Sequence, residues 1–234
     1  MIDFSTLPVS DELKQELNKL EIDFVFQPIF YPDGSTIFGH EALMRPKEKN
    51  VLELIDEYRR KDKLHILEVA TIFGAVKAYN NRGYKEYITI NSFPAESFTE
   101  EEEDAFNAYF GKAKGKGIIE ILEYTTLNME KWHYKKEVLN NKNLGVALDD
   151  FGTGNNNIIA VDVFGPRIVK LDRTVIANIN EDIKKQEQFF YYLDYMHKRG
   201  VMVLAEGVET KAEFDFLVEN EIDLLQGYYL ARPA

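Results

Sequence analysis

Eight short runs rich in β-branched, aromatic and other apolar residues recur along the 234-residue chain, and this repetition restricts its fold more than any other feature. In order, the runs are "DFVFQPIFY", "TIFGHEALM", "EYITINS", "GIIEILEY", "LGVALDD", "RIVKLD", "VMVLAE" and "IDLLQGYYL". Segments with the apolar spacing of helices separate most of them, and "YNNRG" and "YMHKRG" end two such segments with basic residues and a glycine, as helices commonly end. Strands that alternate with helices favour a parallel sheet, so the pattern predicts an α/β fold of the (β/α)₈ barrel type.

The first two runs depart from this pattern. Only "PDGS" (Pro32–Ser35) lies between them, which is too short for a helical crossover but suits an antiparallel hairpin. We therefore expect a modified, TIM-like (β/α)₈ barrel with an antiparallel first strand. Because the chain has no Pro/Gly/Ser-rich linker, low-complexity tract or abrupt change of composition, we expect one domain over residues 1–234.

The composition argues against several functions. The formal net charge of −12 disfavours charge-driven binding of DNA or RNA polymers, which needs Lys and Arg to displace counterions. No apolar run approaches the length of about 18 residues that a membrane-spanning helix needs. The start of the sequence lacks the regions of a signal peptide, and there are no cysteines for disulfides, so we expect a cytoplasmic protein without a membrane segment. An anionic substrate would need local positive charge, most naturally from metal ions.

Polar side chains stand near the ends of the predicted strands, where barrels of this type build their sites. They are Glu41, Asn91, Glu120, Glu123, Asp149, Asp150, Lys170, Glu206 and Gln226. A single strand-terminal carboxylate is usually a helix cap, a turn former or a solvated charge. Several on successive strands of a barrel would converge on one mouth, where uncompensated carboxylates repel one another. Carboxylate and amide oxygens suit Mg²⁺ or Mn²⁺ better than zinc, and a lysine among them would hold a water or a phosphate oxygen.

Other interpretations of single motifs are weaker. The loop "GTGNNN" has the glycines of a dinucleotide-binding turn, but Asp149 and Asp150 would repel the phosphates unless a metal were present. The four histidines show no metal-ligand spacing, and we expect them to be structural. The aromatic run at Phe189–Met196 predicts a core helix face, with a partner-binding face as the alternative.

The motifs taken together resemble one family. In order, they are "FQPIF", "EALMRP", "INSF", "EILE", "DDFGTG", "KLDR", "AEGVET" and "QGYYLARP". This order is similar to that of the EAL-domain phosphodiesterases, bacterial enzymes that hydrolyse the second messenger cyclic di-GMP. The similarity runs from about Phe26 to Pro233. It implies the modified barrel, and a hydrolase that opens one phosphodiester of cyclic di-GMP to give linear 5'-pGpG with two Mg²⁺ or Mn²⁺ ions per site. It also implies a homodimer.

The resemblance implies a role for each matching residue. The metal ligands would be Glu41, Asn91, Glu120, Asp149 and Asp150. The catalytic residues would be Lys170, Glu206 and Asp150, and which of the three takes the proton stays open. The substrate contacts would be Gln27, Arg45 and Gln226, with Gln226 supporting the site from the last strand. Glu123 would anchor the loop that follows the aspartate pair, and the pair itself would let one strand end serve two ions.

Two features depart from the family pattern. Asn155–Asn157 and Ile158 stand where the family commonly has Tyr-Ser-Ser-Leu or close variants, which affects the loop and the dimer contact. The sequence also ends at Ala234, where the family usually adds a helix. The alternative function is a cyclic di-GMP receptor or scaffold that has lost metal ligands. Because every expected ligand position is filled, the sequence predicts an active enzyme. An unrelated metal-dependent barrel hydrolase is a third possibility that the motif order disfavours.

Overall fold

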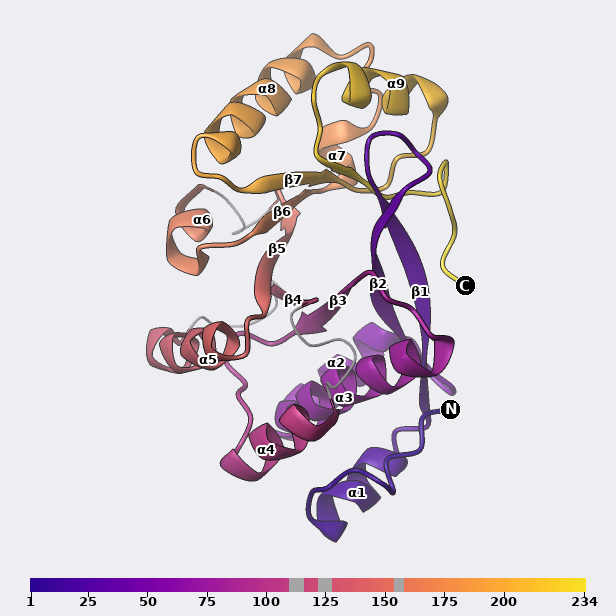
Figure 1. The fold of residues 1–234 in the computed structure, drawn as a ribbon, viewed down its shortest axis with the longest axis vertical. Coiled ribbons are helices and arrows are strands. Elements are labelled where there is room, and N and C mark those ends of the chain that lie inside the picture. Colours follow the sequence, from indigo (N-terminus) through magenta and orange to yellow (C-terminus); the bar gives the residue numbers. More distant parts are fainter. Residues whose placement is uncertain (110–115, 122–127, 154–157) are drawn as a thin grey trace. The chain divides into compact units, whose positions relative to one another are not determined.

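Eight strands follow one another around a closed barrel in the order of the sequence (Figure 1). The computed structural model describes residues 1–109, 116–121, 128–153 and 158–234. The strands are β1 (Ile22–Phe30), β2 (Ile37–Pro46), β3 (Tyr87–Ser92), β4 (Gly117–Ile121), β5 (Gly145–Phe151), β6 (Ile168–Leu171), β7 (Met202–Ala205) and β8 (Leu224–Leu225). The predicted α/β barrel is therefore confirmed.

The first strand runs antiparallel to the last strand of the barrel, in agreement with the antiparallel first strand that the sequence predicts. Phe30 of β1 lies opposite Leu225 of β8 in an antiparallel pair, whereas β5, β6, β7 and β8 pair in parallel. In the turn after β1, the Asp33 carboxylate accepts the backbone N–H groups of Ser35 and Thr36, both at 2.7 Å. Such a turn closes a hairpin without a helix.

One helix precedes β1, and the others lie between successive strands from β2 onward. They are α1 (Asp11–Asn18), α2 (Val51–Arg60), α3 (Leu64–Arg82), α4 (Glu100–Tyr109), α5 (Met129–Asn141), α6 (Ile158–Phe164), α7 (Arg173–Ile176), α8 (Ile183–His197) and α9 (Lys211–Glu219). Gly83 and Gly200, the glycines that the sequence places beyond two helix ends, have φ of 73° and 69°. This left-handed conformation ends a helix at little cost in a residue without a side chain. None of the helices in the described ranges combines the length and apolar character that a membrane span requires.

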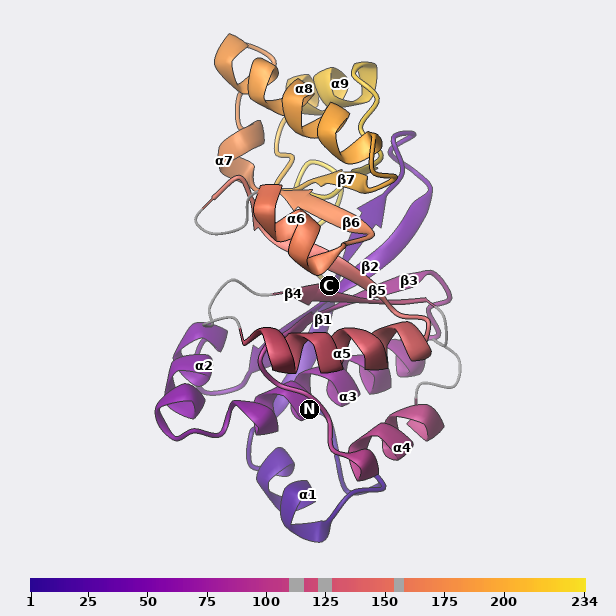
Figure 2. The ribbon, with the colours of Figure 1, turned by 90° about the vertical axis from the view of Figure 1, so that its left-hand side faces the viewer.

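The chain packs into two compact units, which are described separately. The first unit contains Met1–Phe26, Ala42–Ile119 and Tyr124–Leu144. In it, α3 packs on β3, and α1, α2 and α4 pack on α3 (Figures 1 and 2). The helix α3 is buried around much of its circumference, including Phe73 and Tyr79, so it forms the core of this unit.

The second unit contains Gln27–Glu41, Glu120–Glu123 and Gly145–Ala234. Here α8 packs on β7 (Figure 1). The aromatic run of α8 buries Phe189 and Met196, while Phe190 stays 44% exposed. One side of the run is therefore a core face, as the sequence predicts, while Phe190 and Tyr191, which is 56% exposed, lie on the other side. The prediction of one domain over residues 1–234 stays a prediction.

A buried ion pair in the first unit fixes the chain that follows β3. Lys135 on α5 places Nζ 2.6 Å from Glu68 Oε1 on α3 and 2.6 Å from Ser92 Oγ, and it also donates to the carbonyls of Phe93 and Glu96. Glu68 is 1% exposed and Lys135 is 5% exposed. The second carboxylate oxygen of Glu68 accepts the N–H of Phe93 at 2.9 Å. Both charged groups are buried away from bulk solvent, so each depends on the other for its stabilisation.

We expect Lys135→Met to lower the free energy of unfolding by about 3–5 kcal/mol, because it leaves the Glu68 carboxylate charged, buried and without its cation. Lys131→Met is the matched control, since Lys131 lies on the same helix but is exposed. The control should change stability by no more than about 0.5 kcal/mol. Urea unfolding followed by circular dichroism measures both, and equal effects for the two variants would contradict the role of the buried pair.

Candidate functional site

The ammonium of Lys170 lies among four carboxylates that come from four different strands or strand ends. Its Nζ lies 2.7 Å from Glu206 Oε1, 2.8 Å from Asp149 Oδ1, 3.1 Å from Glu120 Oε2 and 3.6 Å from Glu41 Oε1. The lysine side chain is 1% exposed. The structure thus brings together, within the second unit, the strand-end residues that the sequence places on β2, β4, β5, β6 and after β7. We call the five acidic residues Glu41, Glu120, Asp149, Asp150 and Glu206 the carboxylate cluster.

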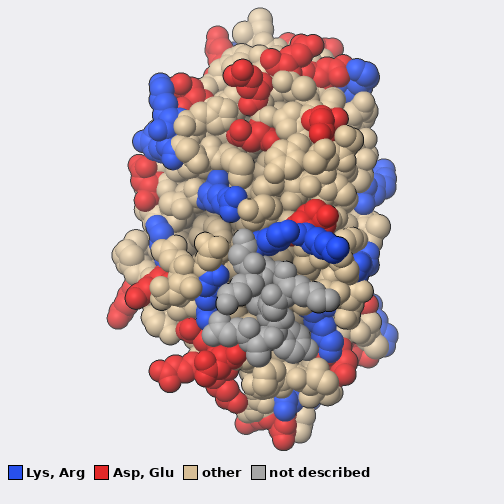
Figure 3. Space-filling view, in the orientation of Figure 1, with Lys and Arg blue, Asp and Glu red and all other residues tan. Residues whose placement is uncertain are grey.

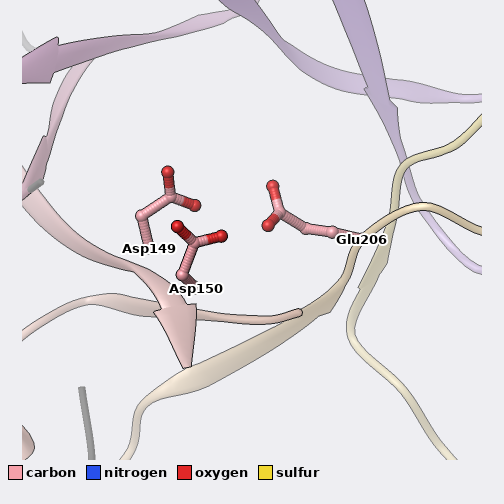
Figure 4. Close-up of side chains that lie close together, drawn as sticks. All are labelled: Asp149, Asp150 and Glu206. Carbon is pink, nitrogen blue, oxygen red and sulfur yellow. The ribbon is translucent and has the colours of Figure 1, made fainter. Parts of the chain in front are cut away.

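A bulge in β5 brings Asp149 and Asp150 to the same side of the strand. In the pairing with β6, Leu148 lies opposite Val169 and Phe151 lies opposite Leu171. Between these pairs, β5 therefore has two residues, Asp149 and Asp150, where β6 has one, Lys170. Asp150 has a φ of 50°, in the left-handed region that few non-glycine residues adopt. Neighbouring side chains of a regular strand point to opposite faces, and a bulge removes that restriction. Figure 4 shows both carboxylates directed toward Glu206.

Within the described ranges, one group of side chains has the arrangement of a metal site. Each of Asp149, Asp150 and Glu206 offers a carboxylate oxygen, and these oxygens lie within 4.8 Å of one another (Figure 4). Together with Glu41 and Glu120, these three residues give the cluster five carboxylates, and the ammonium of Lys170 lies close to Glu41 and Glu120 as well. This excess of negative charge and the all-oxygen donor set fit a hard divalent cation.

The charges of the cluster shift the pKa values of its members and of Lys170. Burial alone would lower the pKa of Lys170, but Asp149, Glu120, Glu206 and Glu41 together raise it well above its ordinary value. The lysine therefore stays protonated. Burial also raises the pKa of Glu206 well above its ordinary value; Lys170 opposes this shift, and the neighbouring carboxylates add to it. A divalent cation would compete with the proton for Glu206.

A pocket of about 320 Å³ opens beside the cluster in the second unit. Glu41, Glu206 and Gln226 lie on its wall, together with Gln27 and Tyr228. The Gln226 side chain donates a hydrogen bond of 2.7 Å to Glu41 Oε2, so it fixes one carboxylate of the cluster. Gln27 donates to the carbonyl of Ala231 at 3.3 Å. The pocket gives a substrate access to the carboxylates.

Several residues with predicted roles are not among those that the second unit brings together. Asn91, half-buried on β3, and Arg45, exposed on β2, belong to the first unit, where the Arg45 guanidinium donates to the carbonyl of Met44 at 3.0 Å. Glu123 and Asn155–Asn157 lie outside the described residues. The roles of all these residues stay predictions.

The sequence motifs assign no role to Arg173, although it is the last residue of "KLDR". Its side chain lines the pocket beside the carboxylate cluster. The available signal was a basic residue two positions after the strand that carries Lys170.

The described Lys and Arg side chains on the face shown in Figure 3 are scattered among Asp and Glu side chains. This distribution agrees with the negative net charge.

Comparison with known proteins decides the family. A family model described as "EAL domain" matches residues 10–233. The chain belongs to the EAL domain family. The probable cyclic di-GMP phosphodiesterase PdeG of Escherichia coli K12 is 31% identical to it over 117 residues, which are 50% of this chain and 23% of PdeG. This EAL domain spans about a quarter of the length of the curated relatives it matches.

Solved EAL structures share the fold. The cyclic di-GMP-bound form of a standalone EAL protein from Vibrio cholerae O395 matches with a TM-score of 0.80 and 25% identity, and covers 92% of this chain and 93% of that one. A manganese and cyclic di-GMP complex of BlrP1 from Klebsiella pneumoniae matches with a TM-score of 0.77 and 22% identity, over 92% of this chain and 56% of that one. The family and the barrel that the sequence motifs predict are therefore confirmed.

We expect Lys170→Met to destabilise the metal-free EAL domain by about 3–5 kcal/mol, because the buried carboxylates lose the cation that offsets their repulsion. Added Mn²⁺ should raise the melting temperature of this variant by more than it raises that of the wild type, since it replaces a larger missing charge. Lys185→Met is the control: this lysine of the same unit is half-buried, and its ammonium donates to the carbonyl of Ala177 at 2.7 Å. A loss of stability in Lys170→Met that Mn²⁺ leaves unchanged would contradict the prediction.

Proposed function

We propose that this EAL domain hydrolyses cyclic di-GMP to linear 5'-pGpG in a reaction that depends on two Mg²⁺ or Mn²⁺ ions. The observation that supports it best is the bulge in β5, which turns Asp149 and Asp150 to one side, facing Glu206. Two adjacent carboxylates on one side can serve two ions. The names of the relatives, which describe phosphodiesterases, support the substrate.

Asp149, Asp150 and Glu206 are the proposed centre of the metal site, and Glu41, Glu120 and Asn91 are proposed to complete the ligand set. When bound, the two cations would lower the pKa of a water molecule and neutralise the charge on the phosphate. The protein must first hold its own carboxylates together. Lys170 supports this by neutralising part of their charge, and Gln226 supports it by fixing Glu41.

Lys170 is proposed to act as a hydrogen-bond donor to the water or to a phosphate oxygen. The carboxylates around it raise its pKa, so at neutral pH it has no free lone pair with which to accept a proton. This leaves Asp150 and Glu206 as the candidates for the general base. Both present carboxylate oxygens on the side where the reacting water is proposed to lie.

The pocket beside the cluster is proposed to receive the nucleotide. Gln27 and Gln226 lie on its wall, and they are proposed to contact the substrate together with Arg45. We also propose that the domain acts in the cytoplasm, where a nucleotide second messenger is made and degraded. Glu123 is proposed to anchor the loop after the aspartate pair.

We expect purified protein to convert cyclic di-GMP to 5'-pGpG with Mg²⁺ or Mn²⁺ and to stop when a chelator removes tightly held metal, because uncompensated carboxylates repel a phosphodiester. Glu41→Ala should lose turnover and bind Mn²⁺ more weakly in calorimetry. Glu181→Ala, an exposed carboxylate of the same unit, is its control. Full turnover without metal would contradict the two-metal proposal. Tight binding of cyclic di-GMP without hydrolysis in the presence of metal would favour the receptor function.

We expect a homodimer whose contact includes α6. This helix begins directly after the loop where the family pairs its barrels, and it exposes Ile159 to 71%, which would fit an apolar contact with a second copy. Light scattering should give twice the chain mass of 27.1 kDa, and Ile159→Glu should give the monomer. Ile183→Glu on α8 is the control, because Ile183 is similarly exposed at 69%. A monomer at micromolar concentrations of the wild type would contradict the dimer.

A further inference from the structure

The segment that follows β7, Glu206–Thr210, carries one member of the carboxylate cluster at its first residue. We call this segment the β7 loop. At its start, the Glu206 N–H donates to the carbonyl of Leu171 at 3.0 Å. On one side, the Val208 N–H donates to the carbonyl of Gln226 at 3.0 Å, and the Tyr229 N–H donates to the carbonyl of Val208 at 3.0 Å. Backbone contacts thus hold one side of the loop.

Arg173, the first residue of α7, holds the other side. Its Nη1 donates to the carbonyl of Gly207 at 2.5 Å and lies 3.2 Å from both carboxylate oxygens of Glu213. Its Nη2 lies 3.0 Å from Glu209 Oε2. The rigid fork of a guanidinium can contact several acceptors at fixed angles, which a lysine cannot do. One side chain therefore contacts two residues of the loop and the helix that follows it.

Glu213, on α9, joins this arrangement from the buried side. It is fully buried and accepts the backbone N–H groups of Glu209 at 3.0 Å, Thr210 at 3.1 Å and Asn178 at 2.9 Å. Burial opposes the charged form of Glu213, but these N–H groups and Arg173 outweigh it and lower its pKa to about 2. A carboxylate held by so many donors fixes the backbone that supplies them.

The fit around Gly207 is close. Gly207 has a φ of 67°, and a Cβ atom added to it would lie 2.9 Å from Cδ of Arg173. The stem of the arginine thus packs directly on the peptide that follows Glu206. A shift of this peptide would move the Glu206 side chain relative to Asp149 and Asp150.

From this geometry we infer that Arg173 and Glu213 are positioning residues that hold Glu206 in place for metal binding, by fixing the backbone of Gly207–Thr210. Neither side chain contacts the cluster itself through the bonds described here; they act on it through the loop. The inference deepens the proposed function, because it rests on the metal centre proposed above.

A simpler role for Arg173 would be to neutralise Glu209, the half-exposed carboxylate of the pocket wall. The two roles make different predictions about which acidic partner of Arg173 matters, Glu209 or Glu213. If neutralisation were the role, removing the charge of Glu209 would make Arg173 dispensable. If positioning is the role, removing the charge of Glu213 should reproduce the loss of Arg173.

The first test measures Mn²⁺ affinity by calorimetry in folded variants. We expect Arg173→Met to weaken Mn²⁺ binding by about 10–100-fold, the range found when residues behind metal ligands are removed. Arg173→Lys should recover part of the affinity, because its ammonium reaches fewer acceptors. Arg199→Met is the control: Arg199 follows α8, pairs with Asp162 at 3.5 Å and should bind Mn²⁺ as the wild type does. Unchanged affinity in Arg173→Met would overturn the inference.

Two further variants separate the roles. Glu213→Gln should weaken Mn²⁺ binding as Arg173→Met does. Adding Glu209→Gln to Arg173→Met should not restore the affinity, and restoration would overturn positioning in favour of neutralisation.

Hydrogen exchange of the metal-free protein gives a readout that needs no metal. The amides of Glu209 and Thr210 should exchange faster in Arg173→Met than in Arg199→Met, and equal rates would overturn the inference. Failure of the wild type to bind Mn²⁺ would overturn the proposed metal centre instead, and the exchange rates would still decide whether Arg173 fixes the loop.

Discussion

The repulsion among carboxylates at the strand ends is the constraint on which the second unit depends. Four carboxylates approach the buried ammonium of Lys170, which offsets a repulsion that would otherwise favour a more open arrangement. A lysine on a strand is well suited to this position, because its long stem crosses the buried layer and carries a compact charge to the carboxylates. Holding these carboxylates close together costs stability, and a cation bound to the folded state would reduce that cost.

The sequence predicted the features that local rules determine. Strands, helix ends and the first hairpin follow from short-range patterns such as "PDGS" and the glycines at Gly83 and Gly200, and the structure confirms them. The convergence of strand-end carboxylates followed from the barrel alone. The bulge at Asp149 and Asp150 could not be predicted, since a regular strand would point the two aspartates to opposite faces.

The sequence also could not predict which charged residues far apart in the chain form buried pairs. Lys135 and Glu68 are 67 residues apart, and Arg173 and Glu213 are 40 residues apart. With 40 acidic and 28 basic residues in the chain, no local pattern indicates which of them are buried together. The pairing depends on which helices the fold places behind which strands. Periodicity marks a helix face as buried or exposed, but it does not name the partner.

These two pairs share a design that links the fold to the site. In the first unit, Glu68 accepts the N–H of Phe93, two residues after Asn91. In the second unit, Glu213 accepts the N–H groups of Glu209 and Thr210, which follow Glu206. In each case a buried carboxylate, paired with a basic side chain, satisfies the backbone just beyond a strand end. Chain leaving a strand loses its ladder partners, so its buried N–H groups need other acceptors. In the second unit Glu213 is that acceptor for Glu209 and Thr210, and the same contacts therefore complete the backbone hydrogen bonding and hold the loop that begins at Glu206.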